Sequence, residues 1–117
     1  MPESAFSFVA FIDDELVGHL VLFTEERHRR RHVGGLGLGV KPTHQRLGVG
    51  DALITTMLHL CDDWLNLRRV ELTVCADNIP AQSLYLKHGF VKEGLARDFA
   101  FRRGQFVDAH YMARVKT

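Results

Sequence analysis

The 117-residue sequence has little cysteine, almost no net charge and no long hydrophobic run. Two cysteines, Cys61 and Cys75, are too few for a disulfide scaffold and fit a reducing compartment. A formal charge of +1 offers no overall attraction for nucleic acid or an anionic membrane. No apolar run approaches the roughly 20 residues of a membrane-spanning helix, and no signal pattern opens the chain. We therefore expect a cytoplasmic protein without nucleic-acid or membrane partners.

Metal ligation is not indicated either. Seven histidines are spread along the chain, and the two cysteines lack zinc-site spacing. Hydrophobic residues make up 46% of the chain and charged residues 25%, which is ordinary for a globular protein. The length suits one domain, residues 1–117, with one modest core and no bound metal.

Apolar and alternating segments in the first third predict three strands, over residues 6–12, 16–24 and 33–40. The sequence "DDE" at 13–15 predicts a turn, so the first two strands would pair as a hairpin. The basic cluster "RHRRRH" at 27–32 then precedes the glycine-rich third strand. This cluster is read as a solvated connection, with contact to nucleic acid or to a cofactor phosphate as the alternatives.

The strongest helical signal covers residues 51–66, where apolar residues recur at helical spacing on one face. These residues are Leu53, Met57, Leu60, Cys61 and Trp64. Alternation predicts a strand over 69–75. Asn78 and Pro80 then predict the start of a short second helix, and Gly89 its end.

Strands over about 90–93 with 99–102, and over 106–115, complete the order β-β-β-α-β-α-β-β. This order predicts a single α/β domain. The strands at 33–40 and 69–75 would be parallel, because a helix crosses between them.

The stretch "VKPTHQRLGVG", Val40 to Gly50, places two glycines at the mouth of the first helix. Unpaired N–H groups and the helix dipole there attract anions such as phosphate. "GGLGLG" at 34–39 is not a dinucleotide fingerprint, because it lies within a strand and opens no helix. The Walker pattern also fails, since Gly50 is followed by Asp51. An ordinary glycine-rich turn remains the alternative.

Two motifs together carry a family resemblance. The first is V-x-P-x-x-Q-R-x-G-x-G from Val40 to Gly50, and the second is N-x-x-A-x-x-x-Y-x-x-x-G-F from Asn78 to Phe90. In this order they resemble the GCN5-related N-acetyltransferase (GNAT) superfamily over about residues 6–115. "CDDWL", "ELTV", "DNIPA" and the ending "VDAHYMARV" look like bacterial amino-acid N-acetyltransferases. The resemblance implies a mixed, mostly antiparallel sheet with a central parallel strand pair and helices packed on it.

The resemblance also implies acetyl-coenzyme A (acetyl-CoA) as co-substrate. Loop amides from Arg46 to Gly50 would hold its pyrophosphate, and the third strand near 38–40 would pair with its pantetheine arm. Glycine in that strand allows a close approach. Asn78 would touch the arm or an ordered water, besides capping the second helix. The cofactor-binding residues so implied are Leu38, Gly39, Val40, Gln45, Arg46, Leu47, Gly48, Val49, Gly50, Asp51 and Asn78.

Acetyl transfer to an amine needs a neutral amine, a stabilised carbonyl oxygen and a protonated leaving thiolate. By the resemblance, Tyr85 is the acid that protonates the thiolate, with plain core packing as its alternative. A backbone N–H near 38–40 could stabilise the oxygen. Many relatives carry a glutamate base on the third or an adjacent strand, but residues 33–40 contain no acid. Glu71, Asp108, His110 or a water relay are the candidates, so the base stays open.

The predicted function is transfer of an acetyl group from acetyl-CoA to the primary amine of a small molecule, such as an amino acid, by direct attack. Family members usually begin with another strand and one or two helices that help form the acceptor pocket, whereas this chain starts at what resembles their second strand. A partner chain that fills the gap and a truncated form are both open. Exposed apolar sheet would favour a homo-oligomer, most simply a dimer. A non-catalytic acetyl-CoA-binding module is the alternative function.

Overall fold

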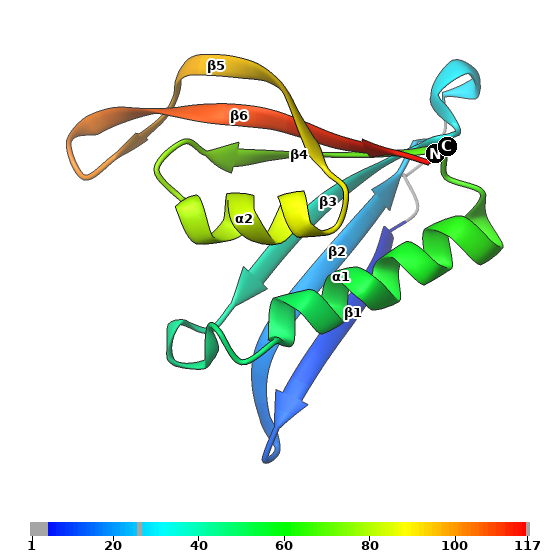
Figure 1. Cartoon of the computed structure of the whole chain (residues 1–117), viewed down its shortest axis with the longest axis horizontal. Helices are drawn as coiled ribbons and strands as arrows, with labels where there is room; N and C mark the ends of the chain where they lie inside the picture. The colour runs from blue at the N-terminus through cyan, green and yellow to red at the C-terminus, as the bar shows by residue number, and fades with distance from the viewer. Residues whose placement is uncertain (1–4, 26, 117) are drawn as a thin grey trace.

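The computed structural model describes residues 5–25 and 27–116. One sheet of six strands, ordered β1-β2-β3-β4-β6-β5, carries helices α1 and α2 on the same face (Figure 1). Short 3-10 turns at 28–30 and 42–44 flank β3. The elements are β1 (Ala5–Ile12), β2 (Glu15–Thr24), β3 (Val33–Val40), α1 (Val49–Leu60), β4 (Arg69–Cys75), α2 (Ile79–Lys87), β5 (Val91–Arg102) and β6 (Gln105–Val115).

The predicted fold class is confirmed. β3 and β4 are parallel, and the four other strand pairings are antiparallel. The predicted hairpin turn is present between β1 and β2, where Asp13 and Asp14 have φ of 50° and 66°. Two successive left-handed residues are typical of a tight turn whose twist matches the flanking strands.

The core lies between the sheet and the two helices. Leu53, Ile54 and Met57 of α1 pack in one cluster with Leu20 and Leu22 of β2. The same cluster continues to α2 and the second half of the sheet, through Leu72, Val74, Tyr85, Phe90 and Met112. A single apolar layer therefore fixes both helices on one side. The other side of the sheet, here called the open face, carries the exposed side chains of Val9, Phe11, Phe23 and Tyr111.

Trp64 is not on the buried helical face that its spacing predicts. Its side chain is 82% exposed, whereas Leu53, Met57 and Cys61 are buried. The reason is that α1 passes into a π-helical turn over Cys61–Leu65. One extra residue per turn rotates every later side chain, so the spacing that predicts burial ends at Cys61.

The two short strands expected at 90–93 and 99–102 form one strand, β5. The irregularities fall between Lys92 and Gly94 and between Ala96 and Ala100, where its register with β6 shifts. Asp98, with φ of 50°, lies in the second of these, and its N–H donates to the Asp108 carboxylate (2.9 Å). The bulges interrupt the sequence alternation without breaking the strand.

Candidate active site

The gap between β3 and β4 is the central feature of the site. Their parallel ladder runs from Val33 with Arg69 to Gly35 with Glu71, and then the strands diverge. The second halves of the strands therefore lie apart, with the end of β3 leading into the loop before α1 and the end of β4 leading into α2 (Figure 1).

Backbone direction decides which groups of β3 face this gap. The Lys41 N–H donates to the Val17 carbonyl (2.8 Å), and the Arg69 N–H donates to the His32 carbonyl (3.0 Å). Because backbone groups alternate along a strand, odd-numbered residues of β3 face β2 and even-numbered residues face β4. The backbone groups of Leu38 and Val40 thus point into the gap, while Gly39 is paired with His19 of β2.

The loop before α1 presents backbone N–H groups to the open end of the gap. The first helical hydrogen bond runs from the Ala52 N–H to the Gly48 carbonyl (3.0 Å), so the N–H groups of Val49, Gly50 and Asp51 have no partner within the helix. Gly48 caps the helix with φ of 83°, a left-handed conformation that suits glycine. This helix end is suited to an anion.

Gly50 has a different role from Gly48. A Cβ at Gly50 would lie 2.8 Å from Cδ2 of Leu84 in α2. The second glycine therefore lets the start of α1 approach α2 closely. Gln45 fixes the loop in turn, because its Nε2 donates to the Val40 carbonyl (3.3 Å).

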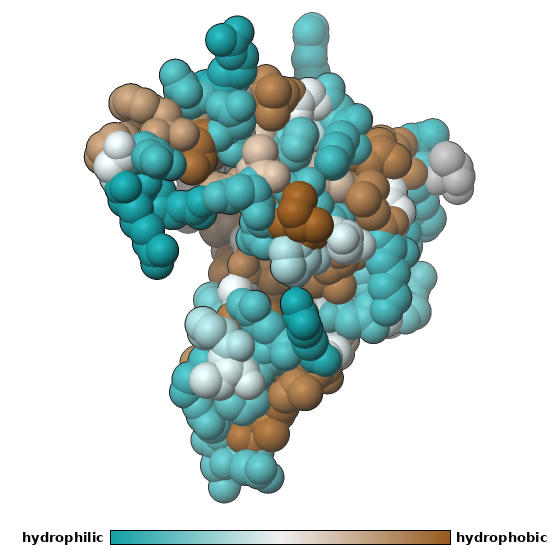
Figure 2. All heavy atoms as spheres, turned by 60° about the vertical axis from the view of Figure 1, so that its left-hand side comes forward, coloured by the Kyte–Doolittle hydropathy of each residue, from teal (hydrophilic) through white to brown (hydrophobic). Residues whose placement is uncertain are grey.

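These elements enclose a cleft of about 640 Å³. In the space-filling view the molecule is notched between the β5–β6 part above and the β1–β2 hairpin below, with apolar residues in the notch (Figure 2). The predicted residues that line the cleft are Leu38, Val40, Gln45, Arg46, Gly48, Val49, Gly50, Asp51, Asn78 and Tyr85. Gly39 and Leu47 do not line it. Gly39 faces β2, and the Leu47 side chain is 63% exposed.

Tyr85 lies on α2 and lines the cleft, with its ring 5.7 Å from that of Phe90. The residue is buried, and burial raises the pKa of its phenol above the ordinary value. The Tyr85 hydroxyl has no hydrogen-bond partner among the described residues, and none of their buried side-chain oxygens lacks a partner. The hydroxyl oxygen itself is therefore not buried. The ring therefore packs in the core while its hydroxyl reaches the cleft. The core and acid readings of Tyr85 are compatible.

Asn78 caps α2 as its position predicts, since its Oδ1 accepts from the Ala81 N–H (3.3 Å). Gln82, one turn further on, is buried and was not singled out from the sequence. Its Nε2 donates to the carbonyls of Cys75 (3.0 Å) and Ala76 (2.9 Å). Gln82 thus satisfies the backbone where β4 has left β3. A glutamine in a short helix that also contains Ser83 and Lys87 gives no sequence signal for this.

The three candidate bases lie in different places. The Asp108 carboxylate accepts from the Asp98 N–H in β5. His110 is paired with Val74 of β4, and neither Asp108 nor His110 lines the cleft. Glu71 lies at the last paired position of β3 and β4, next to the point where they diverge.

Other features were missed or left open by the sequence. Cys75, whose place at the end of a strand already suggests that it is near the cleft, lines it, and so do His44 and Leu84, which carry no local signal. The basic cluster at 27–32 lies at the start of β3, about 26 Å of strand from the glycine loop at its end.

Within residues 5–25 and 27–116, no group of three His, Cys, Asp or Glu side chains could hold a metal ion. No helix among these residues is long and apolar enough to span a bilayer.

Comparison with known proteins identifies the family of the chain. The sequence model of the acetyltransferase (GNAT) family matches residues 1–90. The L-amino acid N-acetyltransferase AaaT of Escherichia coli is 47% identical over 108 residues, which cover 92% of this chain and 67% of that protein.

Solved structures agree. A GNAT-family acetyltransferase from Streptococcus pneumoniae superposes with a TM-score of 0.91 at 29% identity, covering 97% of this chain and 67% of that one. A chimera of the Vibrio cholerae spermidine N-acetyltransferase SpeG and hSSAT gives a TM-score of 0.82 at 27% identity, covering 95% of this chain and 66% of that one.

The family match and the similarity to AaaT define an acyltransferase. The chain belongs to the acetyltransferase (GNAT) family. The unpaired amides at the start of α1 and the backbone of Leu38 and Val40 are the features of this structure that fit a pyrophosphate and an amide-bearing arm.

Proposed function

We propose that the domain formed by residues 1–117 transfers an acetyl group from acetyl-CoA to the primary amine of a small molecule, with amino acids as the first class to test. The parting of β3 from β4 above the free amides of α1 carries this proposal. Free amides at the helix end suit the pyrophosphate. The backbone groups of Leu38 and the N–H of Val40, which point into the gap, suit the amides of the pantetheine arm. The similarity to AaaT supports the choice of amino acids.

The chemistry then follows from the groups in the cleft. The amine nitrogen attacks the thioester carbonyl carbon, and the C–S bond breaks. The oxygen that gains charge is stabilised by a backbone N–H of β3, such as that of Leu38. Tyr85 gives its proton to the departing thiolate and regains one from solvent. Starting from an ammonium group, one proton ends on the thiol and one in solvent, which balances the reaction.

A binding experiment combined with an activity experiment tests this function. Acetyl-CoA is titrated calorimetrically into the purified chain, and thiol release is then followed with a panel of amino acids and polyamines. Binding together with thiol release on an amine is expected. Binding without release on any amine would indicate the alternative, a module that binds the cofactor but lacks acceptor activity. No binding would refute the assignment of the cleft.

Two further properties belong to the same proposal. We infer a cytoplasmic location, because Cys61 and Cys75 are both free thiols, as a reducing compartment maintains. We also infer a homodimer. β5 is an edge strand, and its hairpin with β6 exposes the large side chains of Phe99, Phe101 and Phe106. Exposed apolar groups beside an unpaired strand edge favour pairing with a second copy.

A further inference from the structure

A second cavity lies at the point where β3 and β4 diverge. Its volume is about 590 Å³, and Leu36 and Thr73 line both this cavity and the cofactor cleft. The two spaces therefore adjoin at the end of the β3–β4 ladder. Glu71 and Glu93 line the second cavity and not the first.

Strand register explains why there is a cavity here. Phe23 of β2 is paired with Gly35 of β3, and Gly35 is paired with Glu71 of β4. The three positions form one row across the sheet, and the middle one has no side chain. A Cβ placed on Gly35 would meet nothing within 4 Å. The space between the ring of Phe23 and the carboxylate of Glu71 is therefore open.

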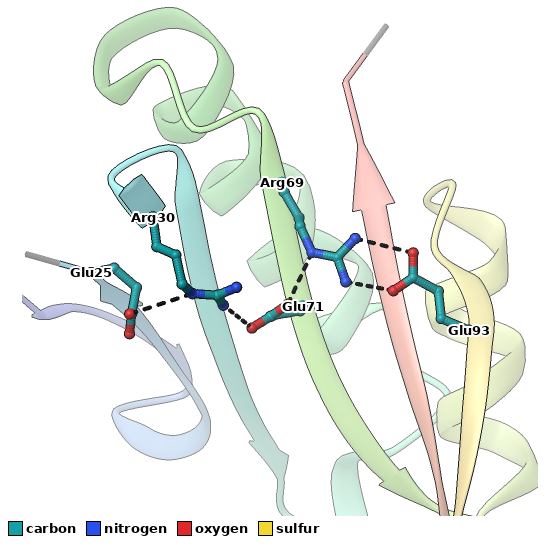
Figure 3. A network of polar contacts seen from close by, with 5 residues as sticks. All are labelled: Glu25, Arg30, Arg69, Glu71 and Glu93. Carbon is teal, nitrogen blue, oxygen red and sulfur yellow. Dashed lines mark hydrogen bonds and ion pairs between the residues drawn. The ribbon is translucent and has the colours of Figure 1, made fainter. Parts of the chain in front are cut away.

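Arg69, Glu71 and Glu93 form the charged wall of the cavity, and they belong to a network of alternating ions that also includes Arg30 and Glu25 (Figure 3). Glu71 of β4 accepts from Arg30 Nη2 (2.6 Å) on one oxygen and from Arg69 Nε (2.9 Å) on the other. Arg69 reaches across β6 to Glu93 of β5 through two hydrogen bonds, of 3.0 and 2.5 Å. At the other end, Arg30 Nε lies 3.6 Å from Glu25. The network holds Glu71 in place beside the divergence of the strands.

The charge balance of this ion network favours binding of a cation in the second cavity. Three carboxylates, each in contact with a guanidinium group, share only two such groups, so the five side chains together carry one net negative charge. Each carboxylate oxygen has two lone pairs, and the two bonds to Glu71 leave acceptor capacity on both of its oxygens. The rings of Phe23 and Tyr111, 45% and 46% exposed, supply an apolar wall.

We propose that this second cavity is the acceptor site, where the Glu71 carboxylate binds the ammonium group of the amine and the rings of Phe23 and Tyr111 pack on its apolar side chain. The proposal rests on the acetyl transfer argued above and names the substrate class: a primary amine that carries a large apolar group. Such an amine lies beside Thr73, where the second cavity meets the cofactor cleft.

Two variants of the full chain test the site by different means. Glu71→Gln removes the charge, and Gly35→Val fills the cavity without a predicted clash, at a strand position that suits a β-branched residue. Both are expected to raise the KM for L-phenylalanine at least tenfold and to leave the Kd for acetyl-CoA within twofold. Glu71→Asp should recover part of the loss, because it keeps the charge. In wild type, kcat/KM should be at least tenfold higher for L-phenylalanine than for glycine or spermidine.

Matched controls separate the site from general damage. Asp63→Asn removes an exposed carboxylate on the turn after α1, and Val9→Leu enlarges a side chain on the open face; neither residue lines a cavity. Both controls should keep the wild-type KM. An unchanged KM in Glu71→Gln and Gly35→Val would overturn the acceptor site, and so would a preference for glycine or spermidine.

Calorimetric titration of L-phenylalanine distinguishes failure of this site from failure of the proposed function. If wild type binds L-phenylalanine and Glu71→Gln does not, but wild type releases no thiol, the pocket is supported and acetyl transfer is overturned. If wild type releases thiol, but L-phenylalanine binds equally well to wild type and to Glu71→Gln, acetyl transfer is supported and the pocket is overturned.

Discussion

His88, which follows α2, lies 2.6 Å from Asp51 in the first turn of α1, measured from Nε2 to Oδ1. Lys87 Nζ lies 3.2 Å from the same oxygen. The hydrogen bonds from His88 and Lys87 hold the pKa of Asp51 below its ordinary value. The His88 contact ties the start of α1 to the end of α2, and Lys87 partly neutralises a carboxylate next to the proposed phosphate site.

Removing the hydrogen bond from His88 should weaken cofactor binding. In His88→Ala the Asp51 carboxylate loses this donor, so more of its negative charge acts on the pyrophosphate, and we expect the Kd for acetyl-CoA to rise about three- to tenfold. Adding Asp51→Asn to this variant should restore the wild-type Kd, because the backbone N–H remains and the charge is gone. Calorimetry on both variants measures this. A double variant as weak as His88→Ala would contradict the charge argument.

Tyr85→Phe should separate chemistry from binding. Loss of the acid is expected to lower kcat about a hundredfold or more, with the acetyl-CoA Kd unchanged because the ring still packs on Phe90. Burial raises the pKa of Tyr85 above that of an ordinary phenol, so the phenol is protonated and able to donate at neutral pH. A kcat–pH profile of wild type should therefore show no loss from this group near neutral pH. Equal losses in kcat and binding would refute the assignment.

Gly48→Val should abolish tight acetyl-CoA binding, with at least a tenfold rise in Kd. The left-handed φ of 83° is unfavourable for valine, so the loop must change its backbone and with it the direction of the free amides at the start of α1. Gly104→Val is the matched control, since Gly104 has φ of 78° in the β5–β6 turn and its Cβ would also meet open space. Each variant should lose about 1–2 kcal/mol of stability from the backbone alone. Only Gly48→Val should change the Kd measured by calorimetry.

The ion pair of Asp62 with Arg114 should stabilise the fold in a pH-dependent way. Two hydrogen bonds of 3.0 and 2.8 Å join the turn after α1 to β6, and the bond from Arg114 lowers the pKa of Asp62. Arg114→Leu should reduce the free energy of unfolding by about 1–3 kcal/mol at pH 7.

The sign of the pH effect follows from the lowered pKa. Stabilisation by Asp62 is present above its unfolded pKa, about 4, and is lost as the pH falls through the folded value. Urea unfolding should therefore show a smaller difference between wild type and variant at pH 3 than at pH 7. Arg29→Leu, at an exposed position in the turn before β3, serves as the control. A difference that is constant with pH would contradict the ionic origin.

The proposed dimer predicts a change in mass. The rings of Phe101 and Phe106 contact each other in a tilted arrangement near the hairpin turn, with their centroids 5.0 Å apart, and both side chains are more than 60% exposed. Replacing both with Ser should convert the wild-type dimer to a monomer in light scattering, with little loss of stability because neither ring is in the core. A wild-type monomer at micromolar concentration would refute the dimer.

Local sequence determined the elements. Alternation gave strands such as 69–75, because one face of a strand is buried and the other is not. Asn78 and Gly89 marked the ends of α2, because capping and left-handed φ are local requirements. The glycine loop before α1 was likewise identifiable, since unpaired amides at a helix start depend on no distant residue. The family motifs added the parting of β3 from β4, which periodicity alone would not show.

Tertiary structure decided the rest. The π turn that exposes Trp64, the reach of Arg69 across β6 to Glu93, and the contact of His88 with Asp51 have no local signal. The last two join residues 24 and 37 positions apart. Which side chains meet over such separations depends on strand register and helix placement. Only the packing of the whole core sets these, because a shift of one residue in register would turn each side chain to the opposite face.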